Sequence, residues 1–62
     1  MALDHEILTV KEVGEVLRVN QSTVYKLVRQ GRIPAFRIGS DWRFRTDEIA
    51  RWLAEQTKGA PH

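Results

Sequence analysis

Only two residues, Arg18 and Val19, separate two segments of this sequence that both show helical periodicity. The first segment begins at Thr9 and has Glu12 three residues later, a pair typical of the capping box at a helix N-terminus. The second segment begins at Asn20, a residue type preferred as an N-cap. Because the connection is so short, we expect two helices that cross at a tight turn.

The second helix is expected to end at Gly31, since glycine is favoured just after a helix C-terminus. Its apolar residues Val24, Leu27 and Val28 recur at helical spacing and are expected to face the core. The opposite face carries side chains that can all donate hydrogen bonds, namely Ser22, Tyr25, Lys26 and Arg29. This polar stripe is a candidate binding surface.

The stretch AFRIGSDWRFR, residues 35–45, alternates apolar and polar residues around a Gly-Ser-Asp turn and predicts a β-hairpin. Folding it at residues 39–41 predicts three cross-strand pairs: Ile38 with Trp42, Phe36 with Phe44, and Arg37 with Arg43. This register places the apolar residues on one face and two arginines opposite each other on the other face. Like charges at such positions destabilise a sheet, so the arrangement calls for a functional explanation.

A third helix is expected after Thr46 as N-cap, with an apolar stripe formed by Ile49, Trp52 and Leu53. The predicted order is helix, tight turn, helix, hairpin, helix, which is an α+β fold that is mostly helical. We expect one domain over residues 8–57. Residues 1–7 are expected to form a flexible N-terminus and residues 58–62 a flexible tail. Trp42 and Trp52 are expected to be mainly core residues, since so short a chain needs their volume.

The net charge of +2 is distributed unevenly along the chain. Residues 18–45 contain seven basic residues and one acidic residue, a net charge of +6, whereas residues 1–17 carry −3 and residues 46–62 carry −1. A basic segment between mildly acidic flanks is typical of a protein that binds a polyanion.

Length and composition argue against several classes of function. A chain of 62 residues has little room for a deep catalytic pocket, and its only histidines are His5 and His62. With no cysteine either, we expect no metal site, no small-molecule cofactor and no catalytic residue. The sequence shows neither a signal peptide nor a run of 18 apolar residues, so we expect a cytoplasmic protein that does not contact a membrane.

The stretch VKEVGEVLRVNQSTVYKLVRQG resembles the bacterial helix-turn-helix, with Gly14 as the small residue early in the first helix. Arg18 departs from the pattern, because many members of that family have glycine in the turn. The continuation GRIPAFRIGSDWRFRTDEIARWL contains a Gly-x-Ile-Pro and a Gly-x-x-Trp-Arg hairpin followed by a short helix. With this second half, the sequence is similar to the excisionase-type branch of the MerR-like winged-helix proteins.

The resemblance implies a winged helix-turn-helix that binds double-stranded DNA sequence-specifically. The second helix would enter the major groove, and the hairpin would be a wing on the backbone or minor groove. It further implies a recombination directionality factor, encoded by a bacterium or phage, that bends DNA. Such a factor often assembles in several copies and steers an integrase toward excision. Related proteins are transcription regulators, and a non-catalytic protein-interaction adaptor is the alternative of another class.

The residues expected to contact DNA fall into three groups. The recognition helix contributes Asn20, Gln21, Ser22, Thr23, Tyr25, Lys26 and Arg29, the wing contributes Arg37, Ser40 and Arg43, and Arg18, Arg32 and Arg45 are further candidates. A phosphate or a narrow minor groove would relieve the predicted repulsion within the wing. Two structural roles compete with this interpretation: an arginine could stack on Trp42, or it could pair with the carboxylates that begin the third helix.

Overall fold

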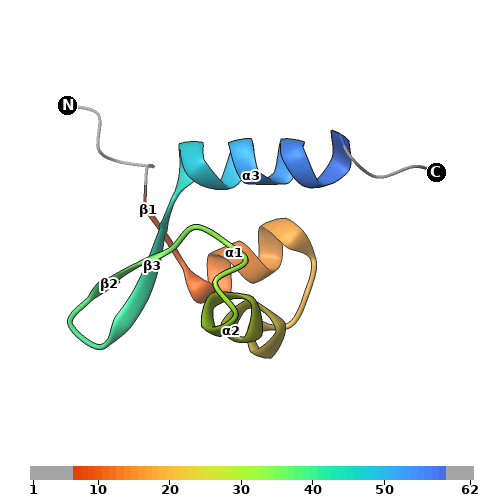
Figure 1. Cartoon of the computed structure of the whole chain (residues 1–62). Helices are drawn as coiled ribbons and strands as arrows, with labels where there is room; N and C mark the ends of the chain where they lie inside the picture. Colours follow the sequence, from red (N-terminus) through yellow and green to blue (C-terminus); the bar gives the residue numbers. More distant parts are fainter. Residues whose placement is uncertain (1–6, 59–62) are drawn as a thin grey trace.

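The computed structural model describes residues 7–58 and shows helices packed around a small sheet (Figure 1). The elements follow in the order β1 (Ile7–Thr9), α1 (Val10–Leu17), α2 (Gln21–Arg29), β2 (Phe36–Ile38), β3 (Asp41–Arg45) and α3 (Thr46–Lys58). The predicted order of helix, turn, helix, hairpin and helix is confirmed, and the fold is α+β and mostly helical. None of the helices in the described residues is long and apolar enough to cross a membrane.

Strand β1 is the element that the sequence pattern did not reveal. Ile7, expected in a flexible N-terminus, pairs with Arg45 in an antiparallel ladder, and β3 is therefore the central strand in the order β1-β3-β2. At the other end Lys58, expected in the tail, is the last residue of α3. The rest of the two predicted flexible ends, residues 1–6 and 59–62, lies outside the described residues. A strand of three residues is too short to show a recognisable alternation.

Helix α1 begins with the capping box that the sequence predicts. The backbone N–H of Glu12 donates to Thr9 Oγ1 at 3.1 Å, and the backbone N–H of Thr9 donates to Glu12 Oε1 at 2.9 Å. An N-cap of this kind contributes about 1 kcal/mol. The cap places the start of α1 directly after β1, so that Val10 and Val13 turn into the core.

The turn between α1 and α2 depends on Gly14 and Arg18. Arg18 has φ 62° and ψ 44°, which is the left-handed region that glycine adopts most easily. The backbone N–H of Val19 donates to the carbonyl oxygen of Gly14 at 2.9 Å. A Cβ atom at position 14 would lie 2.9 Å from the carbonyl oxygen of Val19, so the close approach of this turn to α1 requires the small residue.

Helix α2 starts after Asn20, the expected N-cap, although the Asn20 side chain makes no capping hydrogen bond. The predicted glycine at the end of the helix is confirmed, since Gly31 has φ 67°. The N–H of Gly31 donates to the carbonyl of Val28 at 3.0 Å, and the N–H of Arg32 donates to that of Leu27 at 2.9 Å. These bonds satisfy carbonyls in the last turn and direct the chain away from the helix axis.

The β2–β3 hairpin closes through two residues rather than the three expected from the sequence. Gly39 has φ 64°, and a glycine with positive φ at the first position is what a type II′ turn requires. Such a turn matches the twist of the paired strands, which explains why it forms in place of a longer loop. The expected register is therefore wrong by one residue, and the observed pairs are Phe36 with Arg43, Arg37 with Trp42, and Ile38 with Asp41.

A shift of one residue moves side chains to the opposite face of the sheet. Arg37 lies on the same face as its partner Trp42 and on the opposite face from Arg43. The predicted pair of facing arginines does not exist, so the repulsion inferred from it is absent. The expectation that all apolar residues share one face is also wrong, because Phe36 and Ile38 lie on the face of Arg43.

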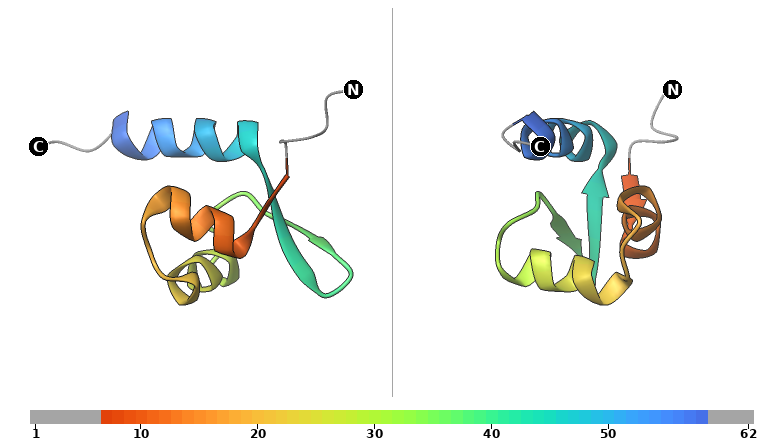
Figure 2. Two further views of the ribbon diagram at one scale, coloured as in Figure 1. Left: turned by 180° about the vertical axis from the view of Figure 1, so that it is seen from behind. Right: turned by 90° about the vertical axis from the view of Figure 1, so that its right-hand side faces the viewer.

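The core lies where α1, α2 and α3 meet the sheet. Phe44 on β3, Val13 on α1 and Val24 on α2 are fully buried. Trp42 and Trp52 are half-buried and pack against this cluster, as expected. Figure 2 shows α3 at one end of the molecule, with α2 and the tip of the hairpin at the other end. This arrangement leaves α2 and the hairpin together at one end, next to solvent.

Candidate nucleic-acid interface

Helix α2 presents the polar stripe that the sequence predicts. Val24 and Val28 are buried and Leu27 is half-buried, so the opposite face of the helix points to solvent. The exposed residues from the predicted recognition set are Asn20, Gln21, Ser22, Tyr25, Lys26 and Arg29, whereas Thr23 is half-buried. Tyr25 remains 40% exposed, which leaves part of its side chain open to solvent. The stripe can donate several hydrogen bonds to one ligand at the same time.

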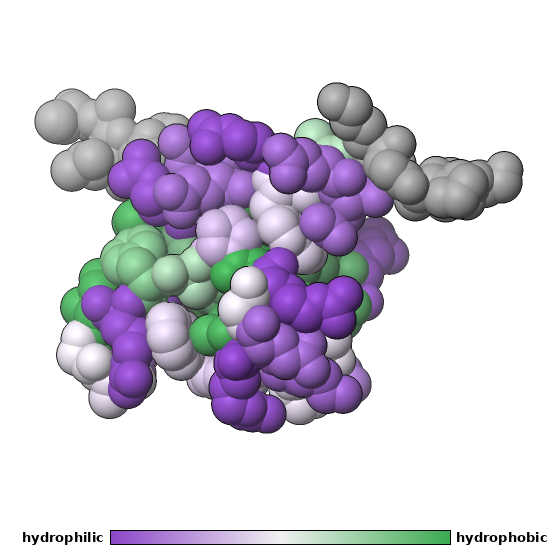
Figure 3. All heavy atoms as spheres, viewed as in Figure 1, coloured by the Kyte–Doolittle hydropathy of each residue, from purple (hydrophilic) through white to green (hydrophobic). Residues whose placement is uncertain are grey.

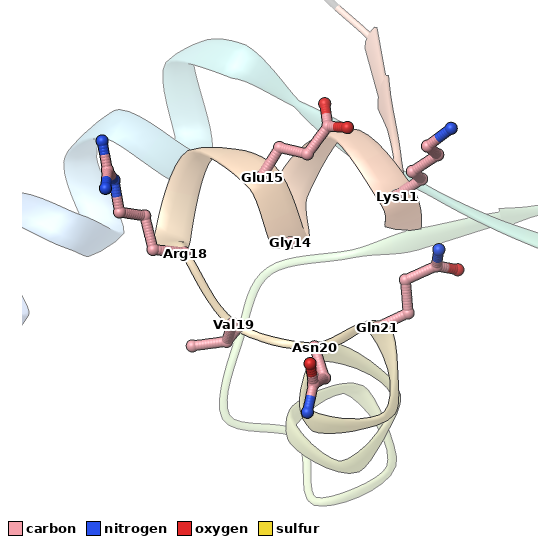
Figure 4. A pocket seen from close by; sticks show the side chains of 7 residues that line it. All are labelled: Lys11, Gly14, Glu15, Arg18, Val19, Asn20 and Gln21. Carbon is pink, nitrogen blue, oxygen red and sulfur yellow. The ribbon is translucent and has the colours of Figure 1, made fainter.

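A hollow of about 390 Å³ lies between α1 and the start of α2 (Figure 4). Its lining comes from both helices and their turn: Lys11, Gly14, Glu15, Arg18, Val19, Asn20 and Gln21. Figure 4 shows the side chains of Lys11 and Gln21 on one side of this hollow and that of Arg18 on the other. The side chains of Lys11 and Arg18 outnumber the one carboxylate of this hollow, Glu15. Together with the partial positive charge at the N-terminus of α2, this balance favours an anionic ligand.

A second hollow, of about 250 Å³, joins α2 to the hairpin. Three elements line it: the start of α1 with Thr9, Val10 and Lys11, helix α2 with Gln21 and Tyr25, and strand β3 with Asp41, Trp42 and Arg43. Residues 20 positions apart in sequence thus form one surface. We call this surface, made of the exposed face of α2 and the β2–β3 hairpin, the α2–hairpin face.

Lys11 is a basic residue that sequence reasoning missed as a candidate. It is exposed and lines both hollows. The charge distribution along the sequence does not identify Lys11 as a candidate, since it is the only Lys or Arg in the acidic segment 1–17. Lys11 lies next to Gln21 for two reasons. The capping box starts α1 one residue before Lys11, and α1 crosses α2 at this point. No sequence signal identifies that position.

The three arginines of the hairpin differ in their partners. The guanidinium carbon of Arg37 lies 5.1 Å from the centroid of the Trp42 ring. Arg43 donates through Nη1 to the carbonyl oxygen of Trp42 at 2.8 Å, and its Nη2 lies 3.8 Å from Asp41 Oδ2. The structural alternative of an arginine stacked on Trp42 is therefore confirmed for Arg37. Ser40 is exposed in the turn between the strands.

Arg45 pairs with the start of α3. Its Nε donates to Asp47 Oδ1 at 3.3 Å and its Nη2 to Asp47 Oδ2 at 3.5 Å. The Arg45 guanidinium, together with the N–H of Glu48 at 2.9 Å, holds the pKa of the Asp47 carboxyl below its usual value. This is the structural role that competed with DNA contact for Arg45.

The two remaining candidates, Arg18 and Arg32, lie in different places. Arg18 is exposed at the turn and lines the hollow beside α2. The carbonyl of Arg32 accepts a 2.7 Å hydrogen bond from Trp52 Nε1, and Arg32 lines an apolar hollow next to α3 with Leu27 and Leu53. The structure thus brings Arg18, but not Arg32, close to the start of α2.

The molecular surface is not uniformly polar. Figure 3 shows apolar side chains gathered between α3 and the hairpin, with hydrophilic side chains over α3 and the helices below it. Ile38 on β2 is 57% exposed and Ile7 on β1 is 43% exposed.

Within residues 7–58, no group of three or more His, Cys, Asp and Glu side chains is placed to hold a metal ion. His5 and His62 lie outside this part of the chain.

Two helices joined by a tight turn define the helix-turn-helix class, and in this chain a β-hairpin and a third helix follow them. The chain matches the family described as "Helix-turn-helix domain" over residues 7–57, and it belongs to this family. The match begins in β1 and ends in the last turn of α3, so it includes every element that forms the α2–hairpin face. No solved structure matches the chain significantly.

The chain is also similar to proteins from two bacteria. It is 47% identical over 38 residues to "Putative DNA-binding protein Rv0500A" of Mycobacterium tuberculosis, a match that covers 61% of this chain and 49% of the relative. It is 30% identical over 53 residues to the uncharacterized protein YvgK of Bacillus subtilis, covering 86% of this chain and 17% of YvgK. The chain thus spans about half the length of the mycobacterial relative and a smaller part of the other.

Proposed function

We propose that this protein binds double-stranded DNA sequence-specifically, with α2 in the major groove and the β2–β3 hairpin on the backbone or in the minor groove. The observation that carries the proposal is the α2–hairpin face, in which an exposed polar helix and a basic hairpin adjoin through one hollow. An α-helix fits the major groove of B-form DNA, where each base pair presents its own pattern of donors and acceptors.

The exposed face of α2 and the hollow beside the start of α2 have distinct roles in the proposal. Lys26 and Arg29, exposed on α2, are suited to guanine, whose O6 and N7 accept hydrogen bonds from basic side chains. Asn20, Gln21 and Lys11 surround the start of α2, where backbone N–H groups and basic charge suit a phosphate. Base contacts would thus give specificity, and phosphate contacts would orient the protein on the duplex.

Two further observations support DNA as the partner. The chain belongs to the helix-turn-helix family, and one of its relatives has the name "Putative DNA-binding protein Rv0500A". The net positive charge lies in residues 18–45, the segment that supplies α2 and the hairpin. The proposed role is binding and requires no catalysis and no cofactor.

Within this function we assign the protein to the excisionase type, a recombination directionality factor that bends DNA and acts with an integrase. The assignment rests on the sequence resemblance over residues 31–53, which contain the Gly-x-Ile-Pro, the Gly-x-x-Trp-Arg hairpin and the short helix that follows it. Several copies would bind side by side, and the protein would act in the cytoplasm of a bacterium. A small MerR-like transcription regulator is the alternative, because it would use the same domain.

The test is selection of a preferred duplex from a random pool, followed by fluorescence anisotropy on that duplex, on a scrambled duplex and on double-stranded RNA. We expect tight binding to the selected DNA alone, since the A-form major groove of RNA is too narrow for a helix. Equal binding to all three would contradict sequence-specific recognition, and no binding would favour the protein-interaction adaptor.

A second measurement separates the two finer assignments. Energy transfer between dyes at the two ends of the selected duplex reports bending, and titration reports how many copies bind. Several copies binding cooperatively on a bent duplex support the excisionase type. A fixed stoichiometry of one copy per site on DNA from a promoter supports the regulator.

A further inference from the structure

Arg37 contacts an aromatic ring rather than a hydrogen-bond acceptor. Its guanidinium carbon lies 5.1 Å from the centroid of Trp42, within the range of a cation–π contact. Arg43 and Arg45, the other hairpin arginines, have the oxygen partners described above. In residues 7–58 no carboxylate lies within ion-pair distance of Arg37 and no oxygen accepts a hydrogen bond from it. The stack therefore leaves the N–H groups of Arg37 available to a ligand.

The Trp42 ring is itself held by the fold. Trp42 is half-buried, packs against the core cluster and lines the hollow that joins α2 to the hairpin, next to Gln21 and Tyr25. The antiparallel register places Arg37 directly opposite Trp42, on the same face of the sheet. The ring thus connects the recognition helix to the wing arginine and restricts the directions in which that arginine can point.

A stacked arginine loses less conformational freedom on binding than one that moves freely in solvent, because its planar fork is already oriented. This argument rests on the proposed function. We propose that Trp42 is a positioning residue for DNA binding, which holds the Arg37 guanidinium in the orientation in which it contacts the negatively charged DNA. The contact is with a backbone phosphate or with the floor of a narrow minor groove, both of which attract guanidinium.

A double-mutant cycle on the selected duplex tests the proposal. Arg37→Gln is expected to weaken binding about tenfold and to lower the salt slope by about one unit, as loss of one phosphate-like contact requires. Trp42→Leu keeps an apolar side chain but removes the ring, and is expected to weaken binding about two- to fivefold, the range of an exposed cation–π contact. The double variant should bind no more weakly than Arg37→Gln alone, because Trp42 acts through Arg37.

Three controls distinguish a loss of Arg37 positioning from a loss of folded protein. Thermal unfolding of each variant gives its folded fraction, to which the affinities are referred. Trp42→Phe retains an aromatic face and should keep most of the affinity. Arg51→Gln removes one positive charge from an exposed position on α3, outside the α2–hairpin face, and should leave the affinity nearly unchanged.

Changing the base pairs that flank the selected site distinguishes a phosphate contact from a minor-groove contact of Arg37. Inosine in place of guanine removes the 2-amino group from the minor groove. A preference of the wild type for A·T or I·C flanks that disappears in Arg37→Gln assigns the contact to the minor groove, and equal losses on all flanks assign it to phosphate. A non-additive cycle supports the proposal in both cases.

Two results would overturn it in distinguishable ways. If the wild type binds DNA but the losses from Trp42→Leu and Arg37→Gln multiply in the double variant, Trp42 does not position Arg37, and the proposed function stands. If the wild type binds no duplex at all, the proposed function fails and this inference fails with it.

Discussion

The backbone N–H of Val19 donates a 2.9 Å hydrogen bond to the carbonyl oxygen of Gly14, so that the turn lies directly against α1. The carbonyl oxygen of Val19 would lie only 2.9 Å from a Cβ atom at position 14. This contact brings the start of α2 close to α1 and sets the angle at which α2 is presented.

Gly14→Ala should therefore destabilise the domain. Alanine gains about 1 kcal/mol of helix propensity over glycine, but a clash with backbone atoms typically costs 1–3 kcal/mol and here cannot be relieved by a side-chain rotation. We expect a net loss of about 1 kcal/mol in urea unfolding followed by circular dichroism. Val16→Ala, on the exposed side of α1, is the matched control and should be neutral or slightly stabilising. A Gly14→Ala variant as stable as the control would contradict the close approach.

Arg18→Gly should stabilise the free domain by about 1 kcal/mol, because Arg18 has a positive φ of 62° that glycine adopts without strain. The same change should weaken DNA binding if the Arg18 side chain contacts a phosphate. Arg18→Ala removes the same charge without relieving the backbone. It should therefore match the glycine variant in DNA affinity and lack its gain in unfolding free energy. Equal stability of the two variants would argue against strain at this turn.

Binding to the selected duplex should depend steeply on salt. If four or five phosphates are neutralised, the slope of log K against log salt is about −4, and affinity should fall about 250-fold between 50 and 200 mM salt. Fluorescence anisotropy at four salt concentrations measures the slope. A flat response would show that the basic residues of the α2–hairpin face are not used on DNA and would favour the adaptor.

Lys26 and Arg29 on α2 are each expected to contact either a base or a phosphate, and alanine variants distinguish the two kinds of contact. Replacing a base-reading residue by alanine should cost about 1–3 kcal/mol on the selected site and less on scrambled DNA. Equal losses on both duplexes would identify that residue as a phosphate contact instead. Val24→Ala is the control for folding, because Val24 is fully buried. The loss of DNA binding in this variant should be proportional to its loss of helical circular dichroism signal.

The pKa of Asp47 should depend on Arg45. The hydrogen bond from Arg45 lowers the pKa of Asp47 from its ordinary value of 3.8. A carboxyl with a lowered pKa in the folded state stabilises the fold above its unfolded pKa, and this contribution is lost as the pH falls from about 4 through the folded pKa. In an NMR titration, Arg45→Gln should raise the pKa of Asp47 toward 3.8. Asp47→Asn should lose less stability than the wild type between pH 6 and pH 3. An unchanged pKa in Arg45→Gln would show that the ion pair does not form in solution.

Local interactions made much of this fold predictable. The capping box of Thr9 and Glu12 and the glycine at position 31 act within a few residues of themselves, and the structure confirms both. The apolar spacing of Val24 and Val28 likewise predicted which face of α2 is buried. The exposed polar stripe follows from that spacing, so the recognition-helix candidates could be named without tertiary information.

The sequence by itself determined where α1 and α2 begin and end and which face of α2 is polar, because caps and periodicity depend on neighbours within one or two turns. Only the tertiary structure decided the hairpin register, the pairing of Ile7 with Arg45, and the position of Lys11 beside Gln21. These features depend on contacts between distant segments, whose energies the local pattern does not contain. A one-residue difference in the hairpin turn thus separated Arg37 from Arg43 and placed it on Trp42 instead.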